Sequence, residues 1–159
     1  MLERIHANLN RQNKALALLL TLLQEEFSLL RQREAPEVSR IEFSIQELLR
    51  QIGAERSELR AMVTAIKPAA KRLAHLLPDL PADDAAVLAQ AMAQADRIEQ
   101  ACAVQAEKNT IMAQALAEQS RSLLEYLHKE IQPKSANTYS GRGRYAVHRP
   151  EASIIHRRS

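Results

Sequence analysis

The stretch Val38–Ile66, VSRIEFSIQELLRQIGAERSELRAMVTAI, decides the fold of this chain. Its apolar residues recur at alternating steps of three and four, at Val38, Ile41, Ile45, Leu48, Ile52, Leu59, Met62 and Ile66, with Glu55 as the one polar interruption. This spacing places them on one face of an α-helix. The stretch therefore predicts a long helix with a single apolar stripe. Pro36 suits its first turn, where a missing N–H costs no hydrogen bond.

The preceding residues predict a second helix of the same kind, from about residue 2 to 33. Its stripe comprises Ile5, Leu9, Leu16, Leu19, Leu23, Phe27 and Leu30, with Gln12 in the vacant position. A connector of only a few residues forces the two helices to lie antiparallel. We therefore expect their stripes to face each other as a coiled-coil hairpin, and we favour this internal core over a groove for a partner. The apolar run Ala15–Leu23 is too short to span a bilayer, so we expect no stable membrane insertion.

After Ile66 the pattern predicts a break followed by a third helix. Pro68 should kink or end the second helix, and the sequence leaves open whether that helix continues past it. Residues 69–77 predict a short helix, and the sequence PDLP at positions 78–81 predicts a clear break. Asp83 or Asp84 is then the expected N-cap of a helix that runs to about Gln132.

The third helix also carries an apolar stripe, formed by Leu88, Met92, Ala95, Ile98, Cys102, Met112, Leu116, Leu123 and Leu127. Gln105 and Asn109 interrupt this stripe at its middle. Polar residues in such a seam often fix the register of the packed helices. Alternatively, this part of the helix faces solvent or a partner, and the sequence does not separate the two readings.

Together these patterns predict an all-α fold: an antiparallel helical hairpin and a long third helix, forming an elongated three-helix bundle or coiled coil over residues 1–132. Residues 133–159 are expected to form a flexible basic tail that is disordered alone. The tail holds six Lys and Arg residues against one acid, or +5, which leaves −2 for the rest of a chain of net charge +3. Its apolar residues are candidate anchors for a segment that folds on binding, although an inert terminus is the usual case: Tyr139, Tyr145, Val147, Ile154 and Ile155.

The sequence offers little chemistry. The five His residues never pair at the helical spacings of a metal site, and no phosphate-binding glycine motif is present. Cys102 lies in register with the apolar stripe, so a small core residue is expected there and not a nucleophile. We predict no catalytic residue, no metal and no cofactor, and hence no enzyme. A single Cys cannot form an internal disulfide, which fits a cytoplasmic location.

Three segments carry a resemblance to a known family. They are the hairpin residues LQEEFSLL at 23–30 with Val38–Arg56, the segment KNTI at 108–111, and NTYSGRG at 137–143. Taken in this order, they are similar to the FlgN family of flagellar export chaperones. Two departures are a single asparagine near position 109, where a pair is common, and Ser140, where glycine usually follows the tyrosine.

The resemblance implies a cytoplasmic chaperone of flagellar type III export. Such a protein binds the hook–filament junction proteins, prevents their premature assembly and delivers them to the export gate. The implied binding region is the late third helix and tail, with Asn109, Leu123 and Leu127 joining the tail anchors as candidate contacts. By motif match, Tyr139 inherits the role of docking to the gate. Two alternatives remain at this point: a structural coiled-coil adaptor or homodimer unrelated to secretion, and a nucleic-acid binder acting through the basic tail, although no nucleic acid is expected as a partner.

Overall fold

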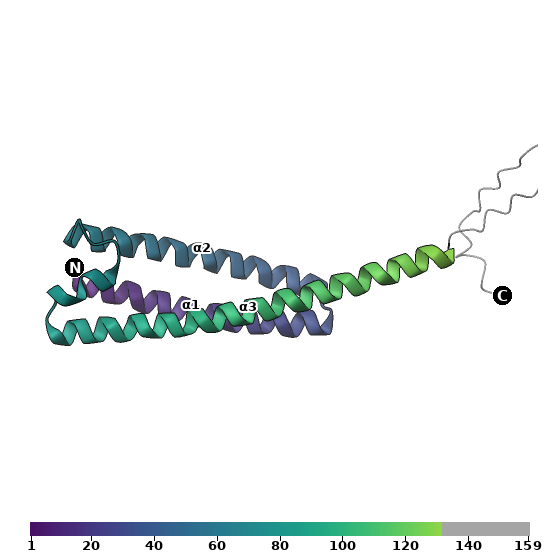
Figure 1. Cartoon of the computed structure of the whole chain (residues 1–159), viewed down its shortest axis with the longest axis horizontal. Helices are drawn as coiled ribbons and strands as arrows, with labels where there is room; N and C mark the ends of the chain where they lie inside the picture. The colour runs from purple at the N-terminus through teal and green to yellow at the C-terminus, as the bar shows by residue number, and fades with distance from the viewer. Residues whose placement is uncertain (132–159) are drawn as a thin grey trace, which may run out of the picture. The chain divides into compact units, whose positions relative to one another are not determined.

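In the computed structural model, residues 1–131 are described, and their regular structure is entirely helical. The elements are α1 (Leu2–Gln32), α2 (Ala35–Ile66), two short 3₁₀ helices, η1 (Leu73–His75) and η2 (Leu77–Asp79), and α3 (Ala82–Ile131) (Figure 1). The predicted all-α class and the three long helices are confirmed. Packing divides the chain into two units, Met1–Ala115 and Leu116–Ser159, and α3 runs from the first into the second.

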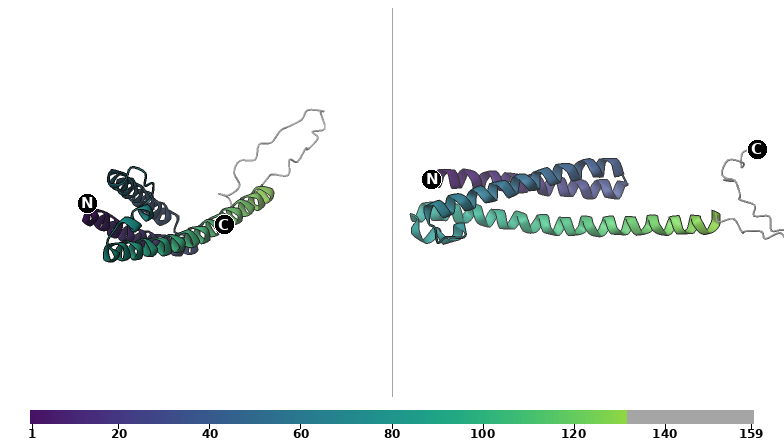
Figure 2. Two further views of the ribbon diagram at one scale, coloured as in Figure 1. Left: turned by 60° about the vertical axis from the view of Figure 1, so that its left-hand side comes forward. Right: turned by 90° about the horizontal axis from the view of Figure 1, so that it is seen from above.

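A tight turn joins α1 to α2 and makes them an antiparallel hairpin, as predicted (Figure 2). Arg33 adopts a left-handed conformation with φ 60° and ψ 33°, and its N–H donates to the carbonyl of Leu30 at 3.1 Å. The N–H of Glu34 donates to the Leu29 carbonyl at 3.1 Å, so the last carbonyls of α1 gain partners after the helix has ended. Pro36 lies in the first turn of α2, where the backbone N–H that proline lacks would have no partner within the helix.

Within residues 1–115 the apolar stripes meet in two core clusters. The cluster near the chain start contains Ile5, Leu9, Met62, Val63, Ala70, Leu73, Leu76, Leu88 and Ala91. The cluster towards the α1–α2 turn contains Leu16, Leu19, Leu23, Ile41, Ile45, Leu48, Ile52 and Cys102. The first part of α3 packs parallel to α1. Two hydrogen bonds show this direction: Asn13 donates to the carbonyl of Ala91 at 3.1 Å, and further along both helices Asn109 donates to the carbonyl of Leu23 at 2.8 Å.

The connector between α2 and α3 corrects one prediction. Residues 69–77 do not form an α-helix, because α2 ends at Ile66 and only the two 3₁₀ helices follow. Pro68 forces the preceding Lys67 into an extended conformation, with φ −139° and ψ 98°, and Pro78 interrupts the segment again. A segment this short between two prolines has little helical stability of its own. Leu73 and Leu76 are nevertheless buried, so the connector closes the end of the first core cluster.

Two further details differ from the predictions. Asp83 and Asp84 are not N-caps, because α3 begins at Ala82 and both lie inside its first turn. The N–H of Ala85 bonds the Pro81 carbonyl at 2.9 Å, while the two carboxylates sit where the helix dipole favours negative charge. Ile66 is exposed, and Val63 takes its place in the core because it faces the connector leucines.

Candidate functional site

Asn109 lies inside the unit Met1–Ala115, which we call the three-helix unit. Its side chain is only 5% exposed, and its amide donates to the Leu23 carbonyl at 2.8 Å and to Oε2 of Glu26 at 2.5 Å. Its own Oδ1 accepts a hydrogen bond from Gln105 at 2.9 Å. Of the two readings of this polar pair, the structure supports the one in which it fixes the register of α3 against α1. Because Asn109 is enclosed and bonded in this way, we do not carry it forward as a cargo contact.

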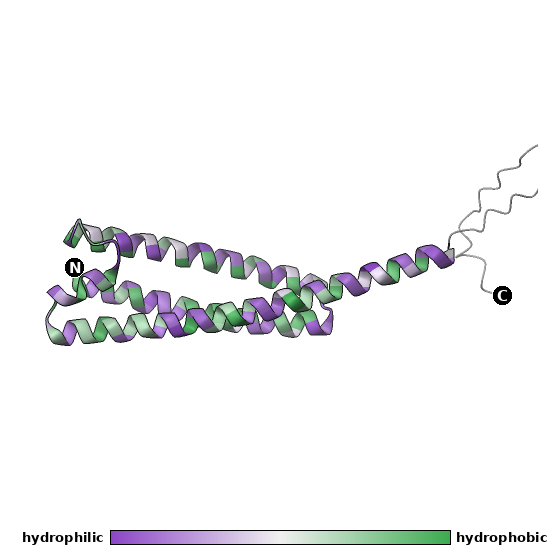
Figure 3. Cartoon of the chain, viewed as in Figure 1, coloured by the Kyte–Doolittle hydropathy of each residue, from purple (hydrophilic) through white to green (hydrophobic). Residues whose placement is uncertain are grey.

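The candidate site is an exposed apolar face on the last turns of α3. Leu123 and Leu127 are 59% and 40% exposed, and one helical turn separates them, so they lie on the same side of the helix. Leu124 and Tyr126 flank this line on either side and are each 60% exposed. Figure 3 shows hydrophobic and hydrophilic residues alternating along this part of α3. We call these four residues the late-α3 face.

The same stripe is covered earlier in the helix. Leu88 and Cys102 are buried, and Met112 and Leu116 are half-buried. From Leu123 onward its members are exposed, although their spacing is unchanged. Four large apolar side chains left exposed within two turns of helix are typical of an interaction surface.

The sequence analysis named Leu123 and Leu127 but missed Leu124 and Tyr126. A stripe defined by steps of three and four selects only the centre of a face. A helix that binds a broad partner uses a wider arc, and the neighbours at i+1 and i+3 would have indicated it. The predicted anchors Tyr139, Tyr145, Val147, Ile154 and Ile155 lie outside the described residues, as does Gln132.

Two ion pairs on the three-helix unit, Arg11–Glu55 and Arg50–Glu47, affect the pKa values of their carboxylates. Arg11 binds Glu55 through two hydrogen bonds, of 2.9 and 2.8 Å, and this holds the pKa of Glu55 below its ordinary value. Arg50 similarly lowers the pKa of Glu47 on the surface of α2. Both arrangements stabilise ionised carboxylates, which is the opposite of what a general acid at neutral pH requires.

Cys102 is a core residue, as predicted. It is 6% exposed, and its thiol donates a weak hydrogen bond to the Leu16 carbonyl at 3.6 Å. Burial, with a smaller contribution from the charge of Glu99, raises the pKa of the thiol. A reactive cysteine needs the reverse shift, so this environment is that of a packing residue.

Two further properties concern residues 1–131. None of their helices combines the length and the apolar character that a bilayer span requires. They also contain no group of three or more His, Cys, Asp or Glu side chains placed to hold a metal ion.

The described residues thus form an antiparallel hairpin and a third helix that buried amides hold against it, with an exposed apolar face on that helix as the candidate binding surface. The sequence model of the FlgN protein matches residues 1–146, which is most of the chain. The chain therefore belongs to the FlgN family, a family of flagellar export chaperones and not of enzymes. No curated protein and no solved structure matches it.

Proposed function

We propose that this chain is a cytoplasmic chaperone of flagellar type III export that binds the hook–filament junction proteins through the late-α3 face. Membership of the FlgN family supports the chaperone role in general. The observation that carries the more specific proposal is the exposure of Leu123, Leu124, Tyr126 and Leu127.

The physical argument rests on the chemistry of the cargo. Proteins that assemble through helical segments carry apolar stripes that must be shielded before secretion. An apolar helix face can cover such a stripe temporarily, as an amphipathic helix packs into a groove or seam. Burial of one Leu side chain contributes about 1.5–3 kcal/mol, so the exposed leucines offset part of the entropy lost on association, and binding that needs further contacts stays reversible. Shielding the stripe would also prevent premature assembly of the cargo.

The tail is proposed as a second contributor. Tyr139 would dock the loaded chaperone to the export gate, a role that the family resemblance suggests. Tyr145, Val147, Ile154 and Ile155 would supply further anchors, and a segment that orders on binding loses entropy, which keeps its affinity moderate and release possible.

Co-expression with hook–filament junction proteins, followed by purification and size-exclusion chromatography, tests the proposal. The full chain should co-elute with at least one of them. The double variant Leu123→Ser/Leu127→Ser should bind it at least about tenfold more weakly, because a loss of about 1.4 kcal/mol has that effect. Failure of the full chain to form any complex would refute the chaperone assignment.

A matched control separates the apolar face from the helix itself. Arg121 and Glu125 have the same spacing as Leu123 and Leu127 but lie on the opposite side of α3 and are exposed. Arg121→Ser/Glu125→Ser should leave cargo binding unchanged. Equal losses in both double variants would show that helix stability and not the late-α3 face governs binding. A stable homodimer that excludes cargo would favour the adaptor alternative.

A further inference from the structure

A groove with an apolar floor and a basic rim lies on the three-helix unit, apart from any residue of the late-α3 face. We propose that it binds an acidic segment of a partner protein that also carries apolar side chains. The groove has a volume of about 250 Å³ and is lined by residues of all three long helices and the connector. The proposal stands independently of cargo binding.

The floor of the groove is apolar. It is formed by side chains from four elements, namely Leu9, Leu59, Val63, Leu73 and Met92. Leu59 and Met92 are half-buried, so part of their apolar surface remains accessible at the groove. An inserted leucine or methionine would gain by covering this surface.

The rim carries Arg56, Arg60, Lys71 and Arg72. Arg56 forms an ion pair with Glu99 of α3. Within residues 1–131, the side chains of the other three, all exposed, form no ion pair.

The neighbouring acids do not neutralise these three cations. Asp79 in the connector is paired with Lys67 at 2.6 Å, and Glu99 is paired with Arg56. Asp96, one turn beyond Met92 on α3, is exposed and forms no ion pair with the rim. The rim is therefore a local excess of positive charge, and a carboxylate-bearing partner is its electrostatic complement.

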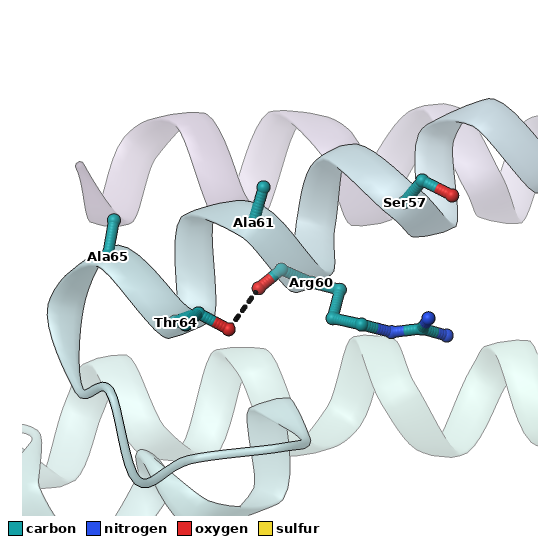
Figure 4. A pocket seen from close by; sticks show the side chains of 5 residues that line it. All are labelled: Ser57, Arg60, Ala61, Thr64 and Ala65. Atoms are coloured by element: carbon teal, nitrogen blue, oxygen red, sulfur yellow. Dashed lines mark hydrogen bonds between the residues drawn. The ribbon is translucent and has the colours of Figure 1, made fainter.

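A second, open hollow continues this surface along α2. It has a volume of about 570 Å³ and is lined by Ser57, Arg60, Ala61, Thr64 and Ala65 (Figure 4). The side chains beside Arg60 are small, and the Thr64 hydroxyl donates a hydrogen bond to the Arg60 carbonyl at 2.9 Å. Arg60 borders both hollows. A helix could approach α2 closely here while its carboxylates reach the rim, which favours a helical segment as the occupant.

The lining favours protein over nucleic acid. None of the residues that form either hollow is aromatic, so no base could stack on them. Three unpaired cations are also few for a phosphate backbone, whose binding depends on many such contacts. The apolar floor, by contrast, matches a peptide that presents both leucine and glutamate.

The test uses a synthetic, fluorescein-labelled helical peptide with Leu at i, i+3, i+4 and i+7 and Glu on both flanks. Binding to the full chain is followed by fluorescence anisotropy. Two comparison peptides replace every Glu by Gln or every Leu by Ser, and a single-stranded oligothymidylate of similar length serves as a polyanion. We expect saturable binding of the Glu/Leu peptide, and at least about tenfold weaker binding of both comparison peptides.

The protein variants locate the binding site. Arg60→Gln/Lys71→Gln/Arg72→Gln should weaken binding of the Glu/Leu peptide at least about tenfold. The matched control, Lys14→Gln/Arg31→Gln/Lys108→Gln, removes three exposed cations elsewhere on the same unit and should change it less than about twofold. Circular dichroism melting checks that both triple variants fold alike.

The proposal is overturned if the Glu/Leu peptide does not bind, or if both triple variants lose affinity equally. It is also overturned if the peptide without Leu, or the oligothymidylate, binds as tightly and depends on the same three cations. Those last results would assign the groove to polyanions in general.

Discussion

Asn8 on α1 donates to Glu55 on α2 twice, to the carboxylate at 2.8 Å and to the backbone carbonyl at 3.0 Å. Asn8 is fully buried, and its Oδ1 accepts a hydrogen bond from Gln12 at 2.6 Å. Gln12 and Glu55 are the two polar interruptions in the stripes of α1 and α2, so the two breaks in the pattern meet through one buried amide. This polar layer lies between the two core clusters and permits one register of the hairpin.

Removal of the buried amide should destabilise the hairpin. Asn8→Ala leaves the buried amide of Gln12 without its acceptor and removes a donor from Glu55, a loss of about 1–3 kcal/mol. For a chain of this size, about 1 kcal/mol shifts Tm by roughly 2–4 °C, so Tm should fall by several degrees. Asn10→Ala is the control, because Asn10 is exposed and its side chain contacts His6 of the same helix at 3.4 Å. Equal Tm values for the two variants, measured by circular dichroism, would contradict a structural role for Asn8.

The Arg11–Glu55 pair predicts a defined pH dependence. The hydrogen bond from Arg11 lowers the pKa of Glu55 from its reference value of 4.5. A depressed pKa stabilises the folded chain fully above that reference value, and the contribution is lost as pH falls through the lower folded value. Glu55→Gln should therefore lower Tm at pH 7, and the difference from the parent should shrink towards pH 3.

Glu47→Gln is the control for that experiment. Arg50 also lowers the pKa of Glu47, but both side chains belong to α2 and are 73% and 66% exposed. Water screens such a pair, so this substitution should change Tm little at either pH. If Glu47→Gln lowered Tm as much as Glu55→Gln, with the same pH dependence, the ion pair between α1 and α2 would contribute no more to stability than an exposed pair within one helix.

Asn109→Asp should destabilise the packing of α3 on α1. The substitution removes the donor to Leu23 and Glu26 and places a carboxylate beside that of Glu26. Tm should fall at pH 7. Glu26→Gln in the same chain should restore much of it, because the new amide can donate to the introduced carboxylate. If Glu26→Gln did not raise Tm again, repulsion between the two carboxylates would not be the cause of the destabilisation.

Cys102 should react slowly in the folded chain. Its burial and raised pKa both oppose thiolate attack, so reaction with a disulfide reagent at neutral pH should be at least about a hundredfold slower than in urea. The control is Cys102→Ala/Ser122→Cys, which moves the thiol to an exposed position of α3. Rapid reaction of the native thiol would show that the second core cluster opens readily.

The sequence predicted the three long helices, the antiparallel hairpin and most of the core, because steps of three and four repeat along α1 and α2 without a competing pattern. It could not predict the fate of residues 69–77, where two prolines override a short leucine pattern. Asp83 and Asp84 are strong capping residues, yet the helix already begins at Ala82 and includes both of them. Helix boundaries depend on the few contacts around them, and here the Pro81 carbonyl supplies the first acceptor.

The candidate site was predicted only in part. Leu123 and Leu127 follow from the stripe, but the stripe does not distinguish these exposed residues from Leu88 and Cys102, which are buried. Periodicity defines a face without saying what covers it. The location of Asn109 was open for the same reason, because a polar residue in a stripe is equally compatible with a buried hydrogen bond and with solvent.

Hydrogen exchange of the full chain, with and without a purified hook–filament junction protein, tests the central proposal most directly. We predict that amides of residues 116–131 exchange quickly in the free chain and become strongly protected in the complex, while residues 38–66 change little. Unchanged exchange at residues 116–131 in a stable complex, with new protection confined to other parts of the chain, would contradict the late-α3 face as the cargo site.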